Sequence, residues 1–245
     1  MGKLEIERIQ KSYGDNQVLA DISFTVQDGE FVAILGPSGS GKSTLFRLIG
    51  GISTPDAGTI RLNHKDITGL RGFISYMPQA SSLLPWRTVL KNVMLGKEIV
   101  DSKTNEEQAL EMIARAGLAG YEYAYPHQLS GGMKQRVSFL RSMLSPQPII
   151  CLDEPFSALD EWTRLEMQKW LLSIWEQYQR SILFVTHHIE EALFLADRII
   201  VLSEKPALVK KEVFIPFERP RSEDIVLSKA FLEYKKMIYH ELRGS

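Results

Sequence analysis

The chain has 245 residues, of which 44% are hydrophobic and 24% charged, and its formal net charge is −1. This composition is that of a globular protein with a sizeable core, in one large domain or two subdomains. The sequence shows no basic stripe, no apolar run long enough to span a membrane and no apolar segment of the kind found in signal peptides. We therefore expect neither a dedicated nucleic-acid binder nor a membrane-spanning or secreted chain. A single cysteine, Cys151, excludes an internal disulfide framework.

The first part of the chain predicts β-structure that leads into a glycine-rich loop. Apolar and polar residues alternate over 22–26, and a turn at Asp28 and Gly29 precedes the continuously apolar run FVAIL at 31–35. Such a run is typical of a strand buried on both faces of a sheet. Further elements are expected in this part: a helix at 42–49, a short hairpin near 59–62 and a strand at 73–77.

From about residue 83 to residue 144 the pattern is mostly helical, most clearly at 106–116. Strand–helix alternation follows and predicts a parallel sheet with crossover helices. We therefore expect an α/β core interrupted by a helical insertion, with an amphipathic helix near the C-terminus. The predicted strands of this part are the short apolar runs at 149–152 (IICL), 182–185 (ILFV) and 199–202 (IIVL).

The run GPSGSGKST at 36–44 has the pattern of a phosphate-binding loop. Its glycines let backbone N–H groups point at phosphate oxygens, and the following helix directs its positive end to the same place. Lys42 is expected to reach the β- and γ-phosphates, and the Ser43 hydroxyl to ligate Mg²⁺. A glycine- and serine-rich surface loop is the alternative, which the flanking strand and helix disfavour. The predicted nucleotide-binding residues are Gly36, Pro37, Ser38, Gly39, Ser40, Gly41, Lys42, Ser43 and Thr44.

Two carboxylates, Asp153 and Glu154, follow the apolar run at 149–152. Asp153 is suited to hold Mg²⁺ through a water, and Glu154 to orient and deprotonate an attacking water. Two acids at a strand end are common, and they acquire this meaning because a phosphate loop lies upstream. Cys151, inside the run, is predicted to be a small buried core residue.

In a second motif, LSGGMKQR at 129–136, Ser-Gly-Gly precedes residues 133–144, which are expected to be helical, and so predicts a helix N-terminus with free N–H groups. Alone it is a glycine turn before a helix. Together with the phosphate loop it resembles the signature motif of ABC-type ATPases, and this resemblance covers essentially the whole chain. It implies that Ser130, Gly131 and Gly132 hold the γ-phosphate of ATP bound to a second copy, so that two chains enclose two ATP molecules head to tail.

The same resemblance implies roles for four more residues. Tyr13 is similar to the aromatic residue that stacks on adenine, with a half-exposed strand-end tyrosine as the alternative. Gln79 resembles the glutamine that senses Mg²⁺ and the γ-phosphate, Asp160 the aspartate of the D-loop, and His187 the switch histidine that contacts the γ-phosphate. The family usually has an acid after the switch histidine, whereas this chain has His188, which we expect to be a surface substitution.

The resemblance thus implies a P-loop NTPase core with a mainly parallel sheet and an N-terminal antiparallel β subdomain. The ATP-binding core is assigned to 1–82 and 145–245, and a helical subdomain carrying the signature motif to 83–144. ATP and Mg²⁺ are the implied cofactors. In this assignment Glu154, His187 and Gln79 are catalytic, and the metal ligands are Ser43, Gln79 and Asp153.

Two classes of protein share these motifs: transporter motors, and DNA-repair or chromosome clamps. The clamps insert long coiled coils, and no segment of this chain has sustained heptads. The segment LLPWRT at 83–88 resembles the corresponding segment in the nitrate, sulfonate and taurine group of bacterial importers. The expected partners are then membrane permease subunits on the cytoplasmic side of the membrane and, indirectly, an extracytoplasmic solute-binding protein, with no nucleic acid. Trp86 is either core of the insertion or part of the surface that docks on the permease.

Overall fold

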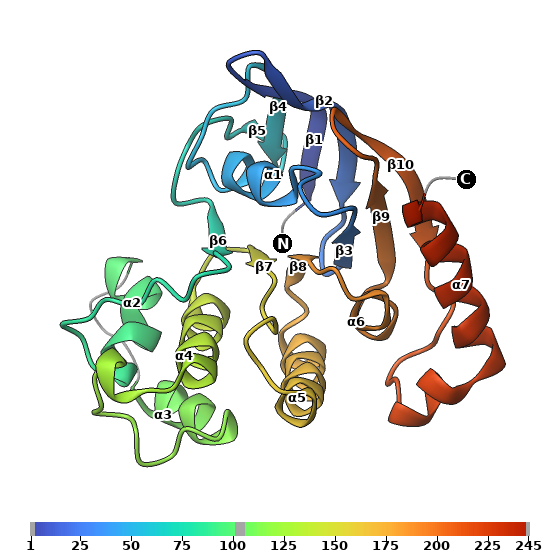
Figure 1. The fold of residues 1–245 in the computed structure, drawn as a ribbon. Coiled ribbons are helices and arrows are strands. Elements are labelled where there is room, and N and C mark those ends of the chain that lie inside the picture. The colour runs from blue at the N-terminus through green and yellow to red at the C-terminus, as the bar shows by residue number, and fades with distance from the viewer. Residues whose placement is uncertain (1–2, 101–105, 244–245) are drawn as a thin grey trace.

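In the computed structural model of the chain, which describes residues 3–100 and 106–243, ten strands form one sheet (Figure 1). Their order across the sheet is β5-β4-β1-β2-β10-β9-β3-β8-β7-β6. The terminal residues Met1, Gly2, Gly244 and Ser245 lie outside the described ranges. The strands are β1 (Leu4–Tyr13), β2 (Asn16–Val26), β3 (Phe31–Leu35), β4 (Ala57–Leu62), β5 (Lys65–Asp66), β6 (Ile74–Met77), β7 (Ile149–Asp153), β8 (Ser181–Val185), β9 (Arg198–Leu202) and β10 (Ala207–Phe214).

Five strands, β6, β7, β8, β3 and β9, pair in parallel and form the half of the sheet that carries the carboxylates. Every residue of β3, β7 and β8 is buried, because helices cover both faces. Alternate residues of β3 enter two different cores: Phe31, Ala33 and Leu35 one, Val32 and Ile34 the other. The continuously apolar runs of the sequence therefore are the central strands, as predicted, and Cys151 is fully buried among them.

The other half of the sheet is antiparallel and N-terminal, which confirms the predicted β subdomain. Strand β1 pairs with both β2 and β4, and β4 pairs with β5. Strand β10 joins the two halves, because it is antiparallel to β9 and contacts β2 in parallel through Ala207 opposite Leu19. The turn between β9 and β10 is therefore held beside the start of β2.

The helices are α1 (Lys42–Ile49), α2 (Val89–Val100), α3 (Glu106–Arg115), α4 (Gly131–Leu144), α5 (Glu161–Tyr178), α6 (Ile189–Leu195) and α7 (Lys229–Arg243), with short 3₁₀ segments η1 (Pro126–Gln128) and η2 (Glu223–Leu227). None of the helices in the described part of the chain is long and apolar enough to cross a bilayer.

Helices α2, α3 and α4 follow one another between β6 and β7, where the helical insertion was expected (Figure 1). The Ser75 hydroxyl of β6 donates to the Ser142 carbonyl of α4 at 3.1 Å, which ties the last of these helices to the sheet. Helix α4 begins earlier than the sequence indicated, at Gly131 and not at Met133. The reason is Ser130, whose hydroxyl caps the helix by accepting from the Met133 amide at 3.2 Å. The division at 83 and 144 stays a prediction.

The C-terminal tail is fastened to the end of α6. Arg221 is buried, and its guanidinium donates to the carbonyls of Leu193, Phe194 and Ala196 at 3.1, 3.0 and 2.8 Å. These are carbonyls at the C-terminus of a helix, which lack partners within the helix. Helix α7 then buries Phe231 and Ile238, in keeping with its predicted amphipathic pattern.

Candidate functional site

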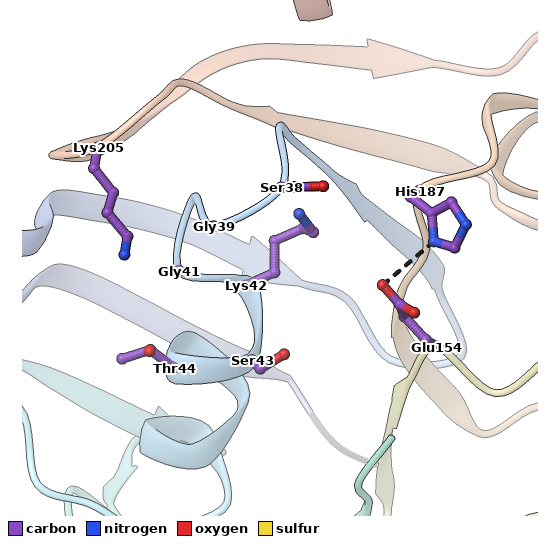
Figure 2. Close-up of a pocket in the computed structure, with 9 residues that line it drawn as sticks. All are labelled: Ser38, Gly39, Gly41, Lys42, Ser43, Thr44, Glu154, His187 and Lys205. Atoms are coloured by element: carbon purple, nitrogen blue, oxygen red, sulfur yellow. Dashed lines mark ion pairs between the residues drawn. The ribbon is translucent and has the colours of Figure 1, made fainter. Parts of the chain in front are cut away.

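A pocket of about 500 Å³ opens where α1 begins (Figure 2). It combines the loop after β3 with residues just beyond β7 and β8 and with the turn between β9 and β10. The carboxyl ends of parallel strands meet at one edge of a sheet, and this is where α/β proteins place their ligands. The pocket is lined by Ser38, Gly39, Gly41, Lys42, Ser43, Thr44, Glu154, His187 and Lys205.

The loop from 36 to 41 is shaped by glycines. Gly39 and Gly41 have φ values of 80° and 93°, in the left-handed region where side chains are disfavoured. A Cβ atom on Gly41 would also lie 2.7 Å from Val18 and 2.9 Å from Leu19 of β2, so the position has no room for a side chain. No side chain caps α1. The amides of its first turn are therefore free to bind an anion.

Lys42 is buried, and its ammonium lies over the loop. Its Nζ donates to the carbonyls of Gly36 and Pro37 at 2.9 and 2.8 Å. Burial lowers the pKa of Lys42, and the nearby carboxylates of Glu154 and Asp153 oppose this. The loop carbonyls thus hold a desolvated cation at the floor of the pocket, where it would attract phosphate.

Asp153, the last residue of β7, is almost fully buried, at 2% exposed. The Ser43 hydroxyl donates to its Oδ1 at 3.3 Å, and the Tyr76 hydroxyl donates to its Oδ2 at 3.4 Å. Burial raises the pKa of Asp153, and these two hydrogen bonds oppose the shift. Burial also raises the pKa of Tyr76, with the Asp153 charge adding to it. The desolvation of the buried carboxylate thus outweighs its two hydrogen bonds.

The donor set of Ser43 and Asp153 fits Mg²⁺. Both are hard oxygen ligands, and they adjoin the phosphate loop. Mg²⁺ is usually held by one or two carboxylates together with phosphates and waters. Within the described ranges no group of three or more His, Cys, Asp or Glu side chains is placed to hold a metal ion. Gln79, the third predicted ligand, instead directs its amide nitrogen to Glu154.

Glu154 is held from several sides. Gln79 Nε2 donates to its Oε2 at 2.9 Å, and His187 Nδ1 lies 3.3 Å from its Oε1. Its amide donates to the Val185 carbonyl at 3.0 Å, and Gln135 Nε2 donates to its carbonyl at 3.3 Å. Its φ is +50°, in the left-handed region, which costs on the order of 1 kcal/mol or more for a residue with a side chain. These contacts fix both the backbone and the carboxylate, which faces the pocket beside His187 (Figure 2).

His187, and not His188, is the histidine that lines the pocket. The two rings lie 4.0 Å apart between centroids. His188 is partly exposed and is the N-cap residue of α6, and its amide donates to the Thr186 hydroxyl at 3.1 Å, so its reading as a surface substitution stays a prediction. Burial lowers the pKa of His188, and the neighbouring His187 adds to this.

The signature motif lies outside the pocket. Ser130 and Gly131 are exposed at the start of α4, and a Cβ atom on Gly131 would meet open space. Gly132 packs against the D-loop, residues 157–160, since a Cβ atom on it would lie 3.3 Å from Leu159. Asp160 caps α5 by accepting from the Thr163 amide at 3.0 Å. One chain therefore does not bring these residues to its own phosphate loop.

Tyr13 also lies outside the pocket lining, at the end of β1. Its side chain is 50% exposed, and the Lys11 ammonium lies 5.5 Å from the centre of its ring. The ring is thus accessible to a flat ligand.

Three residues of the site were not identified from the sequence: Tyr76, Gln135 and Lys205. Gln135 lies within the signature motif, and although it is only 4% exposed its side-chain amide is used, because it donates to the Glu154 carbonyl. Tyr76 is the only polar aromatic in an otherwise apolar and small strand, ISYM. Lys205 carried no local signal, because strand pairing far along the chain brings its turn to the pocket.

Comparison with known proteins agrees with this geometry. Residues 19–157 match a protein-family model described as ABC transporter. The chain is 46% identical over 216 residues to the formylaminopyrimidine import ATP-binding protein of Halalkalibacterium halodurans, covering 87% of this chain and 84% of the relative. It is 39% identical over 239 residues to the nitrate import ATP-binding protein of Synechocystis sp., covering 94% and 90%. A solved dimeric ATP-binding cassette in a post-hydrolysis state, bound to ADP and Pi, superposes with a TM-score of 0.78 at 30% identity, covering 88% of this chain and all of that one.

Proposed function

Because the chain belongs to the ABC transporter family and is an ATPase, we propose that it is the motor subunit of an importer, working as a dimer around two ATP molecules. The observation that carries this proposal is the set of Gln79, Glu154 and His187, hydrogen-bonded or ion-paired beside the phosphate loop. In this proposal separate membrane subunits form the pathway for the solute, and the chain binds them from the cytoplasmic face.

The nucleotide is proposed to bind with its phosphates on the 36–44 loop. The buried ammonium of Lys42 and the uncapped amides of α1 support this placement. Mg²⁺ would be held by Ser43 and Asp153, with the amide oxygen of Gln79 as a further ligand, and would neutralise charge on the phosphates. Tyr13, half-exposed at the end of β1, would stack on adenine.

Glu154 is proposed to act as the general base. Since Gln79 and His187 engage its two oxygens, the carboxylate is fixed in one orientation. A water within hydrogen-bond reach of the carboxylate would pass its proton to Glu154 as its oxygen attacks the γ-phosphorus, while the bond from the γ-phosphorus to the β–γ bridging oxygen breaks and ADP leaves with that oxygen. His187 would face the γ-phosphate from the same side of the pocket, and its own position is set by Glu154.

The second copy would complete each site. Ser130 and Gly131 are exposed at a helix N-terminus and have no role in their own chain's pocket. An uncovered helix N-terminus binds anions, and a two-fold pair of chains presents each such end to the other's phosphate loop. Asp160 and the D-loop, packed on Gly132, would move with it. Closure of the pair would then depend on the γ-phosphate and be released by hydrolysis.

Trp86 is proposed as the centre of the surface that docks on the membrane subunit. It is 71% exposed, which does not fit the alternative of a core residue. The buried Asn92 holds its loop by accepting from the Leu84 amide at 2.8 Å and donating to the carbonyls of Leu84, Arg87 and Thr88. A rigid loop that points a tryptophan outward is typical of an interface anchor.

The solute is proposed to be a small molecule of the nitrate, sulfonate or taurine type, or a pyrimidine such as the one named for the relative from H. halodurans. An extracytoplasmic binding protein would deliver it. The test is to co-express the chain with the membrane proteins encoded beside it. We expect a complex with two copies of the chain, whose ATP hydrolysis rises when the solute-loaded binding protein is added. Absence of any complex, together with binding to DNA ends, would favour the clamp alternative.

A further inference from the structure

Lys205 lines the nucleotide pocket but has no role in the function proposed above. It lies in the turn between β9 and β10, and its side chain extends toward the loop near Gly41, on the side away from Glu154 and His187 (Figure 2). Of the lining residues, only Lys42 and Lys205 are lysines or arginines. Lys205 makes no hydrogen bond or ion pair with any residue that the structure describes.

The turn that carries Lys205 is built against the phosphate loop at both ends. At its start, a Cβ atom on Gly36 would lie 3.1 Å from Leu202 Cβ, so the end of β9 touches the beginning of the loop. At its end, Ala207 pairs with Leu19 of β2, and Leu19 in turn touches Gly41. The turn itself is closed by the Ser203 amide, which donates to the Leu208 carbonyl at 3.0 Å. The lysine is therefore delivered to the pocket by a fixed part of the fold.

The position of Lys205 corresponds to one end of a bound phosphate chain. Glu154 and His187 mark the end where the γ-phosphate reacts, and Tyr13 marks the direction of the adenine. Lys205 lies away from the first pair, beside the strand β2 that leads back to Tyr13. The phosphate nearest to it is then the α-phosphate, next to the ribose.

A second cation beside Lys42 would help to balance the negative charge of a bound nucleotide. Lys42 is buried and bonded to two loop carbonyls, and the acids Asp153 and Glu154 lie on the γ-phosphate side. A nucleoside diphosphate or triphosphate brings several negative charges into the same pocket. An exposed lysine ammonium can contact a phosphate as a point charge without a fixed geometry.

We propose that Lys205 is a nucleotide-binding residue whose ammonium contacts the α-phosphate, contributing affinity for both ATP and ADP without taking part in bond cleavage. This inference rests on the proposed placement of the phosphates on the 36–44 loop. Because the contact is the same before and after hydrolysis, it stabilises the substrate and product complexes equally.

The test compares Lys205→Met with Lys205→Arg, which keeps the charge, and with Lys236→Met, which removes an exposed lysine on α7 outside the pocket. Binding of ADP, AMP and adenosine is measured by calorimetry, and ATP hydrolysis by steady-state kinetics. Lys205→Met should weaken ADP and AMP about fivefold, the range of a partly exposed charge pair. Adenosine affinity and kcat should not change, KM should rise about as much as the ADP dissociation constant, and higher salt should reduce the difference. Lys205→Arg should stay within about twofold of the parent chain.

Three results would overturn the inference. ADP affinity equal to that of the parent chain would show no contact, and an equal loss of adenosine binding would place the lysine at the base or sugar. An arginine variant as weak as the methionine variant would indicate that the change disturbs the turn. Lys42→Ala separates this inference from the proposed function: if Lys42→Ala retains full ADP affinity, the phosphate placement itself fails, whereas an effect of Lys42→Ala without one of Lys205→Met removes only the role of Lys205.

Discussion

Nδ1 of His187 lies 3.3 Å from Oε1 of Glu154, although the two residues follow different strands, β8 and β7. The register that pairs Asp153 of β7 with Val185 of β8 places both side chains at the same edge of the sheet. Gln79 then takes the second oxygen of the carboxylate from the loop after β6. Residues that follow three neighbouring parallel strands thus converge on one acid and orient its carboxylate.

Replacing this acid gives the first prediction. Glu154→Gln keeps the shape of the side chain and its partners but removes its ability to accept a proton. We expect ATP binding to persist, hydrolysis to fall on the order of 10²-fold or more, and the ATP-bound dimer to accumulate. Steady-state phosphate release and sedimentation with ATP measure the two effects. Glu190→Gln, an exposed carboxylate on α6 that does not line the pocket, is the control. Near-normal turnover in Glu154→Gln would remove Glu154 as the base.

A second prediction concerns the free energy of unfolding that is lost by burying the charged carboxylate of Asp153, the proposed metal ligand. Burial raises the pKa of Asp153 in the folded chain above its unfolded value. The folded state then binds more protons than the unfolded state, so this group's contribution to stability falls as pH rises through the shifted pKa. Asp153→Asn removes that cost. We expect the variant's free energy of unfolding near neutral pH to rise by on the order of 1 kcal/mol, so that it unfolds at a higher denaturant concentration. This increase in stability should disappear in acid, where Asp153 is protonated in the parent chain.

The same variant should lose Mg²⁺-dependent ATP affinity, because a neutral amide is a poorer ligand than a carboxylate. Chemical unfolding without Mg²⁺ at several pH values, and nucleotide titrations with and without Mg²⁺, measure the two effects separately. A loss of stability at neutral pH would mean that the hydrogen bonds from Ser43 and Tyr76 outweigh the desolvation of the carboxylate.

The contrast between Lys42 and Lys205 shows how much of the site could be predicted from the sequence. Lys42 belongs to a contiguous motif of a buried strand, a glycine turn and a helix. Because this local geometry places the lysine, its position could be predicted. Lys205 reaches the same pocket through the pairing of β10 with β2, which depends on contacts between distant segments. The fold followed the same division: apolar runs predicted the central strands, while the start of α4 required the cap made by Ser130.

A third prediction tests the second copy. Ser130→Arg places a long cation at the exposed start of α4, where a partner's γ-phosphate is proposed to lie. It also removes the helix cap, at a cost of about 1 kcal/mol. Ser130→Ala removes the cap without the bulk and is the matched control. In a Glu154→Gln background, we expect Ser130→Arg to bind ATP as a monomer while Ser130→Ala still dimerises, as measured by sedimentation. An unchanged dimer in Ser130→Arg would contradict the shared site.

The last prediction separates docking from catalysis at Trp86. Its side chain is 71% exposed and outside the nucleotide pocket, so Trp86→Ala should change the free energy of unfolding by no more than about 0.5 kcal/mol. Basal hydrolysis by the isolated chain should stay within about twofold, since no group of the pocket is altered. An aromatic anchor at an interface is commonly worth about 2 kcal/mol or more, so assembly with the membrane subunits and solute-stimulated hydrolysis should fall severalfold or further. Leu227→Ala, which truncates another exposed apolar side chain on η2, should leave transport intact. Equal losses of basal hydrolysis, stability and transport in Trp86→Ala would instead indicate that the substitution disturbs the fold of the helical insertion and would contradict a role in docking alone.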